Sequence, residues 1–298
     1  MCRALHRGVD LETVRVTLPT DPAAPVNAFT VDVEDWYQSC IDFDAPITER
    51  VVRNLDRLLL VLDDCGVKGT FFVQGRVAET FPGVVASLVE QGHEVQAHGY
   101  SHRPLYSMGR NALRSEVERA KKTVEDASGS LVTAFRAQDF SILARNLWAL
   151  EALVEAGYRV DSSIFPMRSR HYGVPGWDVA PHRVRLEAGA TLLEVPVAIW
   201  GDGRWRFPVA GGGYFRVLPK HLLVHALSSI SRHRPAIVYC HPYEFNPHEL
   251  DDYRARVPRR LRASQSLGRR AFADRIRTLL ARLRFGRFDE VLTAWGIA

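Results

Sequence analysis

The chain has 298 residues, of which 46% are hydrophobic and 24% are charged, with a formal net charge of +5. This composition is typical of globular proteins, and the length suffices for one large domain or two small ones. No run approaches the roughly 18 apolar residues that a membrane-spanning helix needs, and the N-terminal segment lacks the unbroken apolar stretch of a secretory signal, so we expect a cytoplasmic protein.

Apolar runs and helical patterns alternate along the first half of the chain. Short runs rich in β-branched and aromatic residues predict strands at residues 27–33, 69–75, 93–99 and 131–137. Apolar residues at helical spacing predict a helix after each strand, at residues 48–66, 77–91, 110–128 and 144–156.

The second half continues this alternation with longer connections. Strands are predicted at residues 158–163, 192–200 and 236–241, and a helix at residues 221–233. Two Gly/Pro-rich segments, 165–181 and 201–213, are expected to be long functional loops over the mouth of the fold. Because repeated strand–helix units imply parallel strands with right-handed crossovers, we predict an α/β sheet or barrel.

The C-terminal part of the chain carries most of the basic excess. Residues 253–287 are rich in arginine and could contact phosphates, anionic lipid or an acidic polymer. The end of this segment places Phe272, Ile276 and Leu280 on one face of a helix, with the arginines largely outside that face. We therefore favour a docked amphipathic helix with a solvated basic face, and expect no nucleic-acid partner.

Polar side chains gather where the predicted strands end. In chain order, these residues are Asp32, Glu34 and Asp35, then His98 and His102, then Arg136, Asp161 and His241. Ligands and chemistry in parallel α/β folds lie at the carboxyl ends of the strands. The sequence therefore predicts one convergent site at that edge.

His98 and His102 stand four residues apart, so on a helical turn their Cβ atoms would lie about 5–6 Å apart on one face. Two imidazoles and one carboxylate with an open position form the ligand set of a catalytic zinc site. Histidines at this spacing are also common as structural or surface residues, and the sequence DVED could cap a helix or form a salt-bridged turn. Three acids at a buried strand end are costly unless paired or metal-bound, which favours the metal site.

Five ordered motifs resemble those of a known family. The polysaccharide deacetylase family, also called the NodB-homology family or carbohydrate esterase family four, has motifs similar to TVDVEDW, AHGYSH, FRAQDFSI, DSSIFP and VYCHPYEF. Its branch associated with exosortase and exopolysaccharide gene clusters resembles the chain further in DVEDW, GGGYFR and HPYEF. Allantoinase-like and peptidoglycan-deacetylase-like proteins are related to that branch.

The resemblance implies a fold and a division of the chain. The family fold is a distorted (β/α) barrel of about seven parallel strands. We expect an N-terminal extension at residues 1–26, the catalytic domain at residues 27–249, and a basic helical extension packed on the barrel at residues 250–298.

The resemblance also implies roles for single residues. Asp32 matches the catalytic base, Arg136 the arginine that orients this base, and His241 the general acid. His98 and His102 match two ligands of one divalent metal ion, for which zinc is expected.

The third metal ligand stays open between Glu34 and Asp35. The family commonly has two adjacent aspartates, whereas this chain has D-V-E-D. Residue type slightly favours Asp35, whereas alternation along a strand would place Glu34 on the same face as Asp32. A second departure is Gln138, where many relatives have proline, so the local loop is expected to differ.

Four residues are candidates for contact with substrate. Trp36 and Tyr214 could stack on sugar rings near the mouth, and Tyr243 could shape the pocket, although aromatic residues in loops more often serve packing. Asp161 could support His241 or Arg136 through a hydrogen bond, or could cap a turn.

We therefore expect a metal-dependent hydrolase that removes N-acetyl groups from N-acetylhexosamine units of a polysaccharide or its precursor, in exopolysaccharide biosynthesis. One alternative is an allantoinase-like cyclic amidase, against which the presence of both His98 and His102 argues. The other is a non-catalytic protein that binds glycan or polyanion. The basic C-terminal region suggests peripheral contact with anionic lipid at the inner face of the membrane.

Overall fold

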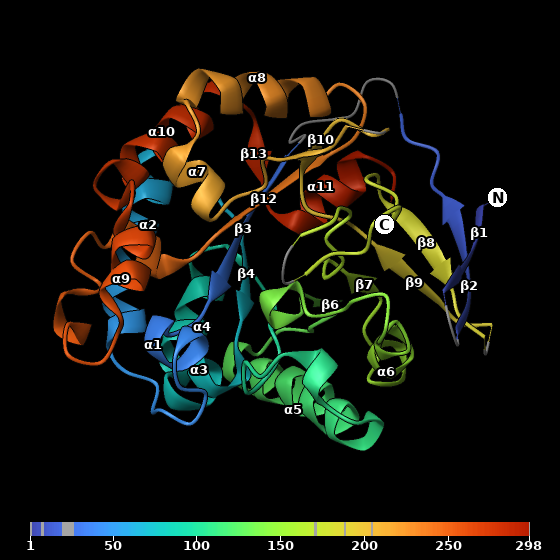
Figure 1. The fold of residues 1–298 in the computed structure, drawn as a ribbon, viewed down its shortest axis with the longest axis horizontal. Helices are drawn as coiled ribbons and strands as arrows, with labels where there is room; N and C mark the ends of the chain where they lie inside the picture. Colours follow the sequence, from blue (N-terminus) through green and yellow to red (C-terminus); the bar gives the residue numbers. More distant parts are fainter. Residues whose placement is uncertain are drawn as a thin grey trace.

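A computed structural model describes residues 2–6, 9–19, 27–169, 172–187, 189–203 and 205–297. Within these residues, seven parallel strands form the centre of the molecule (Figure 1). Their order across the sheet is β9 (Thr191–Glu194), β7 (Val160–Asp161), β6 (Ala134–Phe135), β5 (Glu94–Ala97), β4 (Thr70–Val73), β3 (Asn27–Val33) and β12 (Ala236–Cys240). The predicted α/β fold with about seven parallel strands is thus confirmed.

The two ends of this row of strands approach each other. After β9, the backbone N–H of Ala198 donates to the carbonyl of Ile237 in β12 at 2.9 Å. Gly211 forms a parallel bridge with Tyr239 of the same strand. The parallel strands therefore curl into a distorted barrel instead of a flat sheet.

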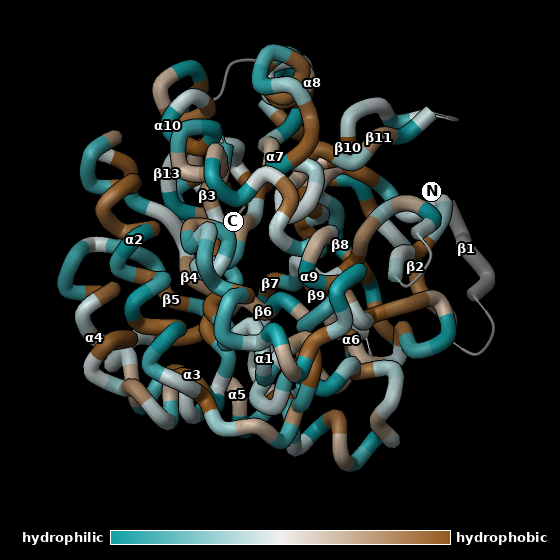
Figure 2. The backbone as a smooth tube through the Cα atoms, turned by 60° about the vertical axis from the view of Figure 1, so that its left-hand side comes forward, coloured by the Kyte–Doolittle hydropathy of each residue, from teal (hydrophilic) through white to brown (hydrophobic). Residues whose placement is uncertain are grey.

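Helices cover the outside of the parallel strands (Figure 1). They include α2 (Arg50–Asp64), α4 (Pro82–Glu90), α5 (Arg110–Ser128), α6 (Ala149–Glu155) and α8 (Lys220–Ile230). In α2, Val51, Leu55, Leu58 and Leu62 recur every three or four residues and are all buried. Figure 2 shows the matching alternation of hydrophilic and hydrophobic residues along this helix. Burial of this apolar face holds α2 against the strands.

Several predicted elements are divided or shortened; the strands expected at residues 131–137 and 158–163, for example, are reduced to β6 and β7. The helix expected at residues 77–91 is broken into α3 (Gly75–Thr80) and α4, because Pro82 has no N–H to continue the hydrogen bonding and instead begins α4. The helix expected at residues 144–156 begins only at Ala149. The strand expected at residues 192–200 is divided into β9 and β10 (Ile199–Trp200), which pairs with β11 (Phe207–Pro208).

An antiparallel edge, absent from the predictions, extends the sheet beyond β9. It consists of β8 (His182–Arg185), β2 (Val9–Arg15) and β1 (Cys2–His6), each antiparallel to its neighbour. The side chains of β8 alternate between buried and exposed, so the strand lacks the continuous apolar run that marked the others. Residues 20–26, the end of the predicted N-terminal extension, lie outside the described residues.

The basic C-terminal region contains α9 (Arg259–Ser266), α10 (Phe272–Arg282), β13 (Phe285–Gly286) and α11 (Phe288–Ala294). α10 buries Phe272, Ile276, Leu279 and Leu280 on one face, whereas α9 buries none of its residues. β13 pairs in parallel with β3, so this region adds a strand to the central sheet. Among the described residues, no helix has both the length and the apolar character needed to cross a bilayer.

Candidate metal centre and active site

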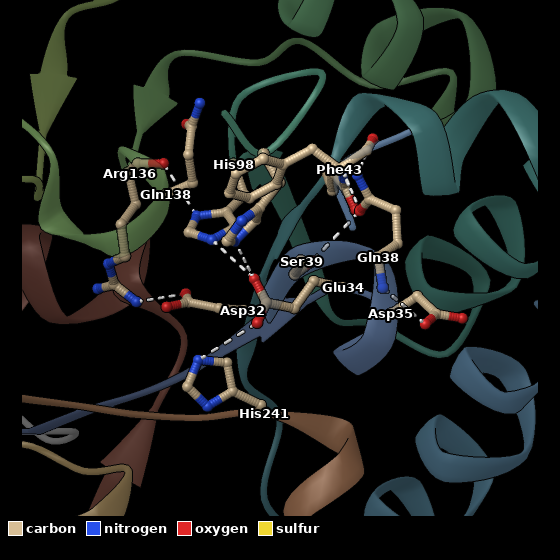
Figure 3. A network of polar contacts seen from close by, with 12 residues as sticks. Asp32, Glu34, Asp35, Gln38, Ser39, Phe43, His98, Arg136, Gln138 and His241 are labelled. Carbon is tan, nitrogen blue, oxygen red and sulfur yellow. Dashed lines mark hydrogen bonds and ion pairs between the residues drawn. The ribbon is translucent and has the colours of Figure 1, made fainter. Parts of the chain in front are cut away.

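Glu34, His98 and His102 come together beyond the carboxyl ends of β3 and β5. Each offers one ligand atom, and these atoms all lie within 4.8 Å of one another. Nε2 of His98 lies 3.5 Å from Oε2 of Glu34, and Nε2 of His102 is in ion-pair contact with the same oxygen. All three side chains are buried, and Figure 3 shows His98 directed at the Glu34 carboxylate. The structure thus brings both predicted imidazoles onto one carboxylate.

A loop carries the two histidines, in contrast to the helical turn considered from their spacing. His98 follows β5 directly, and Gly99 and His102 both have a left-handed backbone, with φ of 64° and 65°. A Cβ atom on Gly99 would clash with the end of the Gln138 side chain and would add strain at this positive φ, so glycine is favoured there. The left-handed turns fold the chain back and let His102 face the same carboxylate as His98.

Glu116 of α5 holds this loop in place. Its Oε1 accepts the backbone N–H groups of Tyr100 at 2.9 Å and of Ser101 at 2.7 Å. Gln138, at the position where many relatives have proline, donates from Nε2 to the carbonyl of Arg103 at 2.6 Å. Gln138 therefore supports the histidine loop from the neighbouring strand end.

The buried polar atoms of the cluster fit a metal ion. Nδ1 of His98 lies 2.9 Å from the carbonyl oxygen of Arg136, which can only accept, so Nδ1 carries the hydrogen and Nε2 presents its lone pair toward Glu34. Oε2 of Glu34 and both ring nitrogens of His102 lack a hydrogen-bond partner among the described residues, apart from their mutual ion-pair contact. Buried polar atoms normally have partners, and two imidazole nitrogens with one carboxylate oxygen suit zinc.

Charges within the cluster shift the pKa of two groups. Burial would raise the pKa of Glu34, but the charge of His102 and its hydrogen bond hold this pKa well below its usual range. Burial would lower the pKa of His102, but Glu34 raises it to about 9. Because a ligating imidazole must be neutral, a metal ion binding here would displace the proton of His102.

Asp35 lies outside the cluster. Its carboxylate caps α1 (Trp36–Cys40), where Oδ1 accepts the N–H of Tyr37 at 3.0 Å. Oδ2 accepts the N–H of Thr48, also at 3.0 Å. Figure 3 shows this carboxylate pointing away from His98. The slight preference for Asp35 as a metal ligand is therefore corrected in favour of Glu34, the alternative that strand alternation favoured.

Arg136 is completely buried and contacts Asp32 of β3. Its Nη1 lies 2.9 Å from Oδ1 of Asp32 and also donates to the hydroxyl of Thr30 at 2.7 Å. Nη2 donates to the hydroxyl of Ser162 at 3.1 Å, and the guanidinium lies 4.2 Å from the ring centroid of Phe72. Bonds on several sides fix the guanidinium, which in turn orients the Asp32 carboxylate (Figure 3).

His241 follows β12 and faces Glu34 from the side opposite His98 (Figure 3). Its Nε2 lies 3.9 Å from Oε1 of Glu34, and the hydroxyl of Tyr243 donates to this oxygen at 3.1 Å. Burial would lower the pKa of His241, but the hydrogen bond with Glu244 and the charge of Glu34 raise it above its usual value. A raised pKa favours the protonated ring that a general acid needs.

Asp161 does not form the expected hydrogen bond with His241 or Arg136. It is completely buried in β7, where it accepts a hydrogen bond from the hydroxyl of Ser163 and pairs with Glu194 of β9. No contact with His241 or Arg136 is found within the described part of the chain. A side chain without exposed surface cannot reach a substrate, so Asp161 is corrected to a structural residue.

The buried pair of Asp161 and Glu194 gives a prediction for stability. Burial raises the pKa of Asp161 to about 6 and that of Glu194 well above its usual value. The folded protein therefore binds protons that the unfolded chain has released, so this pair stabilises below about pH 4, and its contribution is lost as pH rises through about 6. Glu194→Gln should reduce the fall in unfolding free energy that occurs as pH rises, by on the order of 2 kcal/mol.

Urea unfolding of both proteins between pH 4.5 and 7.5 measures this difference. The stability of Glu194→Gln relative to the wild type should rise with pH. Glu90→Gln, at the exposed end of α4, is the matched control and should follow the wild type. If the difference in unfolding free energy between wild type and Glu194→Gln stayed constant over this range, the raised pKa values of the buried pair of Asp161 and Glu194 would be contradicted.

One of the aromatic candidates, Trp36, lies in different surroundings from those expected. Trp36 is only 1% exposed and packs against Tyr253, with ring centroids 5.5 Å apart, so it is a core residue and not a sugar-stacking surface. Tyr214 in α7 (Gly213–Val217) is partly exposed and lies against Tyr172. Among the candidates, Tyr243 alone is in hydrogen-bond contact with the cluster.

Three supporting residues escaped prediction as parts of the site: Thr30, Glu116 and Ser162. Thr30 precedes Asp32 by two residues, so strand alternation could have indicated that both face the same side. Glu116 lies on the buried face of α5 beside Leu113 and Val117, and an acid at such a position is a signal that the sequence offered.

Comparison with known proteins supports the same family. Residues 40–160 match the family model described as Polysaccharide deacetylase, and residues 162–293 match one described as Domain of unknown function (DUF3473). Peptidoglycan-N-acetylglucosamine deacetylase of Bacillus cereus is 30% identical over 109 residues, which is 36% of this chain and 38% of that protein. The chain spans about a third to a half of the length of curated relatives such as this one.

Solved structures show a similar fold over nearly the whole chain. A putative polysaccharide deacetylase from Mycobacterium smegmatis has a TM-score of 0.61 at 19% identity, covering 96% of this chain and 95% of that one. Puue allantoinase has a TM-score of 0.59 at 12% identity, covering 92% of each chain. At these identities the likeness concerns the fold alone. Residues 40–160 thus match the polysaccharide deacetylase family model, and the whole chain has a fold similar to that of a putative polysaccharide deacetylase.

Proposed function

We propose that the protein is a metal-dependent hydrolase that removes N-acetyl groups from N-acetylhexosamine units of a glycan. One observation carries the proposal: the Glu34, His98 and His102 ligand atoms lie within 4.8 Å of one another, and Asp32 and His241 lie beside Glu34 (Figure 3). A metal-binding set, a base and an acid around one point are what amide hydrolysis requires.

An amide has a poorly electrophilic carbonyl and a poor leaving group. Glu34, His98 and His102 would hold one divalent cation, with zinc as the expected ion, whose chemistry is to polarise an acyl oxygen and to acidify water. Asp32, oriented by Arg136, takes a proton from the attacking water. The acetyl carbon gains the water oxygen, the C–N bond breaks, and His241 donates the proton that the departing amine needs.

Several finer points belong to the same proposal. Residues 27–249 are proposed as the catalytic unit, because they contain every proposed metal-binding and catalytic residue. The glycan is proposed to be an exopolysaccharide or its precursor, with Tyr214 and Tyr243 near the bound sugar. The exposed arginines of α9 support a peripheral contact with anionic lipid at the cytoplasmic face of the membrane.

Acetate release tests this function directly. The purified chain should release acetate from an N-acetylated chito-oligosaccharide, lose this activity with a chelator, and regain it with zinc. Allantoin belongs in the same panel because the fold is shared with an allantoinase. Turnover of allantoin alone would replace the proposal with cyclic amide hydrolysis. Glycan binding without turnover of any substrate would indicate a binding protein.

A further inference from the structure

Glu244 is a buried carboxylate beside the site that has no role in the proposed reaction. It is 2% exposed and lies three residues after His241 in the sequence, in the short 3₁₀ turn η3 (Pro242–Phe245). Its Oε2 accepts the backbone N–H of His241 at 3.1 Å and lies 3.2 Å from Nδ1 of the same residue. One carboxylate oxygen thus holds both the backbone and the ring of His241.

These contacts leave the opposite ring nitrogen directed at the metal-binding cluster. Nε2 lies 3.9 Å from Glu34. The ring stacks on Tyr243, with centroids 4.8 Å apart and planes inclined by 10°, and meets the edge of Tyr239 at 5.7 Å. Tyr243 limits the tilt of the ring, and the bond to Glu244 determines which nitrogen faces Glu34.

One arginine contacts Glu244 itself, and a second arginine holds the backbone beside it. Nε of Arg216 in α7 lies 3.2 Å from Oε1 of Glu244. Arg269, in the 3₁₀ turn η5 (Arg269–Ala271), is 2% exposed and donates to the carbonyl of Tyr243. These charges and His241 hold the pKa of Glu244 below its usual value although burial would raise it. Glu244 is therefore anchored on the side away from the histidine.

His241, Glu244, Arg216 and Arg269 all lie within residues 162–293, the region matched by the domain of unknown function. Asp32, Glu34, His98 and His102 precede that region. We propose that Glu244 is the positioning residue of His241 and that the 162–293 region supplies the proton-donating half of the active site. The inference rests on the proposed function, and it identifies Glu244 in the role for which Asp161 was one candidate.

Substrates with different leaving groups can distinguish a positioning role of Glu244 from a purely structural role. When an amide is cleaved, the C–N bond breaks and the proton on Nε2 of His241 passes to the amine nitrogen. An aryl acetate releases a phenolate, which is stable without a proton, so it needs base and metal but little acid catalysis. Loss of a correctly oriented acid should therefore slow amide hydrolysis much more than aryl ester hydrolysis.

Glu244→Gln is the main test, with a chito-oligosaccharide and 4-nitrophenyl acetate as substrates. We expect kcat for the amide to fall about 10²-fold with little change in KM, and kcat for the ester to fall less than about threefold. Arg216→Gln, which leaves Glu244 in place, should also lower kcat more for the amide than for the ester, but to a smaller extent. His241→Ala should show this difference most strongly.

Glu249→Gln is the matched control. Glu249 is as buried as Glu244 and bonded to Asn54 at 2.8 Å and Asn246 at 3.0 Å, without contact with His241. It should change both activities equally. Equal losses on both substrates in Glu244→Gln and Arg216→Gln, or no loss in either, would overturn the inference while wild-type acetate release stands. Wild-type protein without chelator-sensitive acetate release would instead overturn the proposed function.

Discussion

Asp32→Asn is expected to lower kcat for a chito-oligosaccharide by about 10²- to 10⁴-fold, the usual contribution of a general base. The amide that replaces the carboxylate has nearly the same shape and still accepts a hydrogen bond from Arg136, but it cannot take a proton from water. The measurement is acetate release at saturating substrate, together with zinc content, which should remain near that of the wild type.

Stability needs a separate control, because Asp32→Asn leaves the buried guanidinium of Arg136 without its carboxylate partner at 2.9 Å. Removing one member of a buried ion pair can cost about 3–5 kcal/mol. Thr30→Val removes another bond of the same guanidinium but keeps the base. It should lose stability and retain most of its turnover. If Asp32→Asn folds and keeps turnover within about tenfold of wild type, Asp32 is not the base.

Glu34→Gln and Asp35→Asn form a pair of neighbouring substitutions with opposite expected results. Glu34→Gln removes the carboxylate that contacts both imidazoles. Because replacement of residues that only support a ligand already costs about 10- to 100-fold in metal affinity, loss of a ligand should cost more than about 100-fold. Acetate release should fall with the bound zinc.

Asp35→Asn should retain zinc and activity. Its carboxylate bonds to Tyr37 and Thr48, so the expected loss is about 1 kcal/mol of unfolding free energy, typical of a weakened helix cap. Equilibrium dialysis against zinc and urea unfolding measure the two effects on both variants. Zinc retained by Glu34→Gln but lost by Asp35→Asn would restore the original preference for Asp35.

The two halves of the site depend on different parts of the chain. The proposed base lies in β3 and the proposed metal ligands follow β3 and β5, whereas His241 follows β12 and bonds to Glu244. β12 lies directly beside β3 in the sheet, although more than 200 residues separate them in sequence. Parallel pairing with Asn27–Val33 is what brings the proton donor next to the base, since both strands end at the same edge.

The sequence by itself determined the parallel core and most residues of the site. Its strands are short segments rich in apolar residues, because most of their side chains are buried, and its helices repeat apolar residues every three or four positions. Local patterns of this kind can be read one element at a time. Asp32, His98, His102, Arg136 and His241 were recognised because motif order carries information that periodicity lacks.

Only the tertiary structure decided which groups meet. Glu34 and Asp35 are adjacent acids, and their separate roles arise because one faces two imidazoles while the other caps α1 and bonds to Thr48. The edge strands β1, β2 and β8 and the supporting residue Glu116 were not predicted for the same reason. Their effects depend on contacts between residues far apart in sequence, or on the direction of a side chain, and a single sequence specifies neither in a readable pattern.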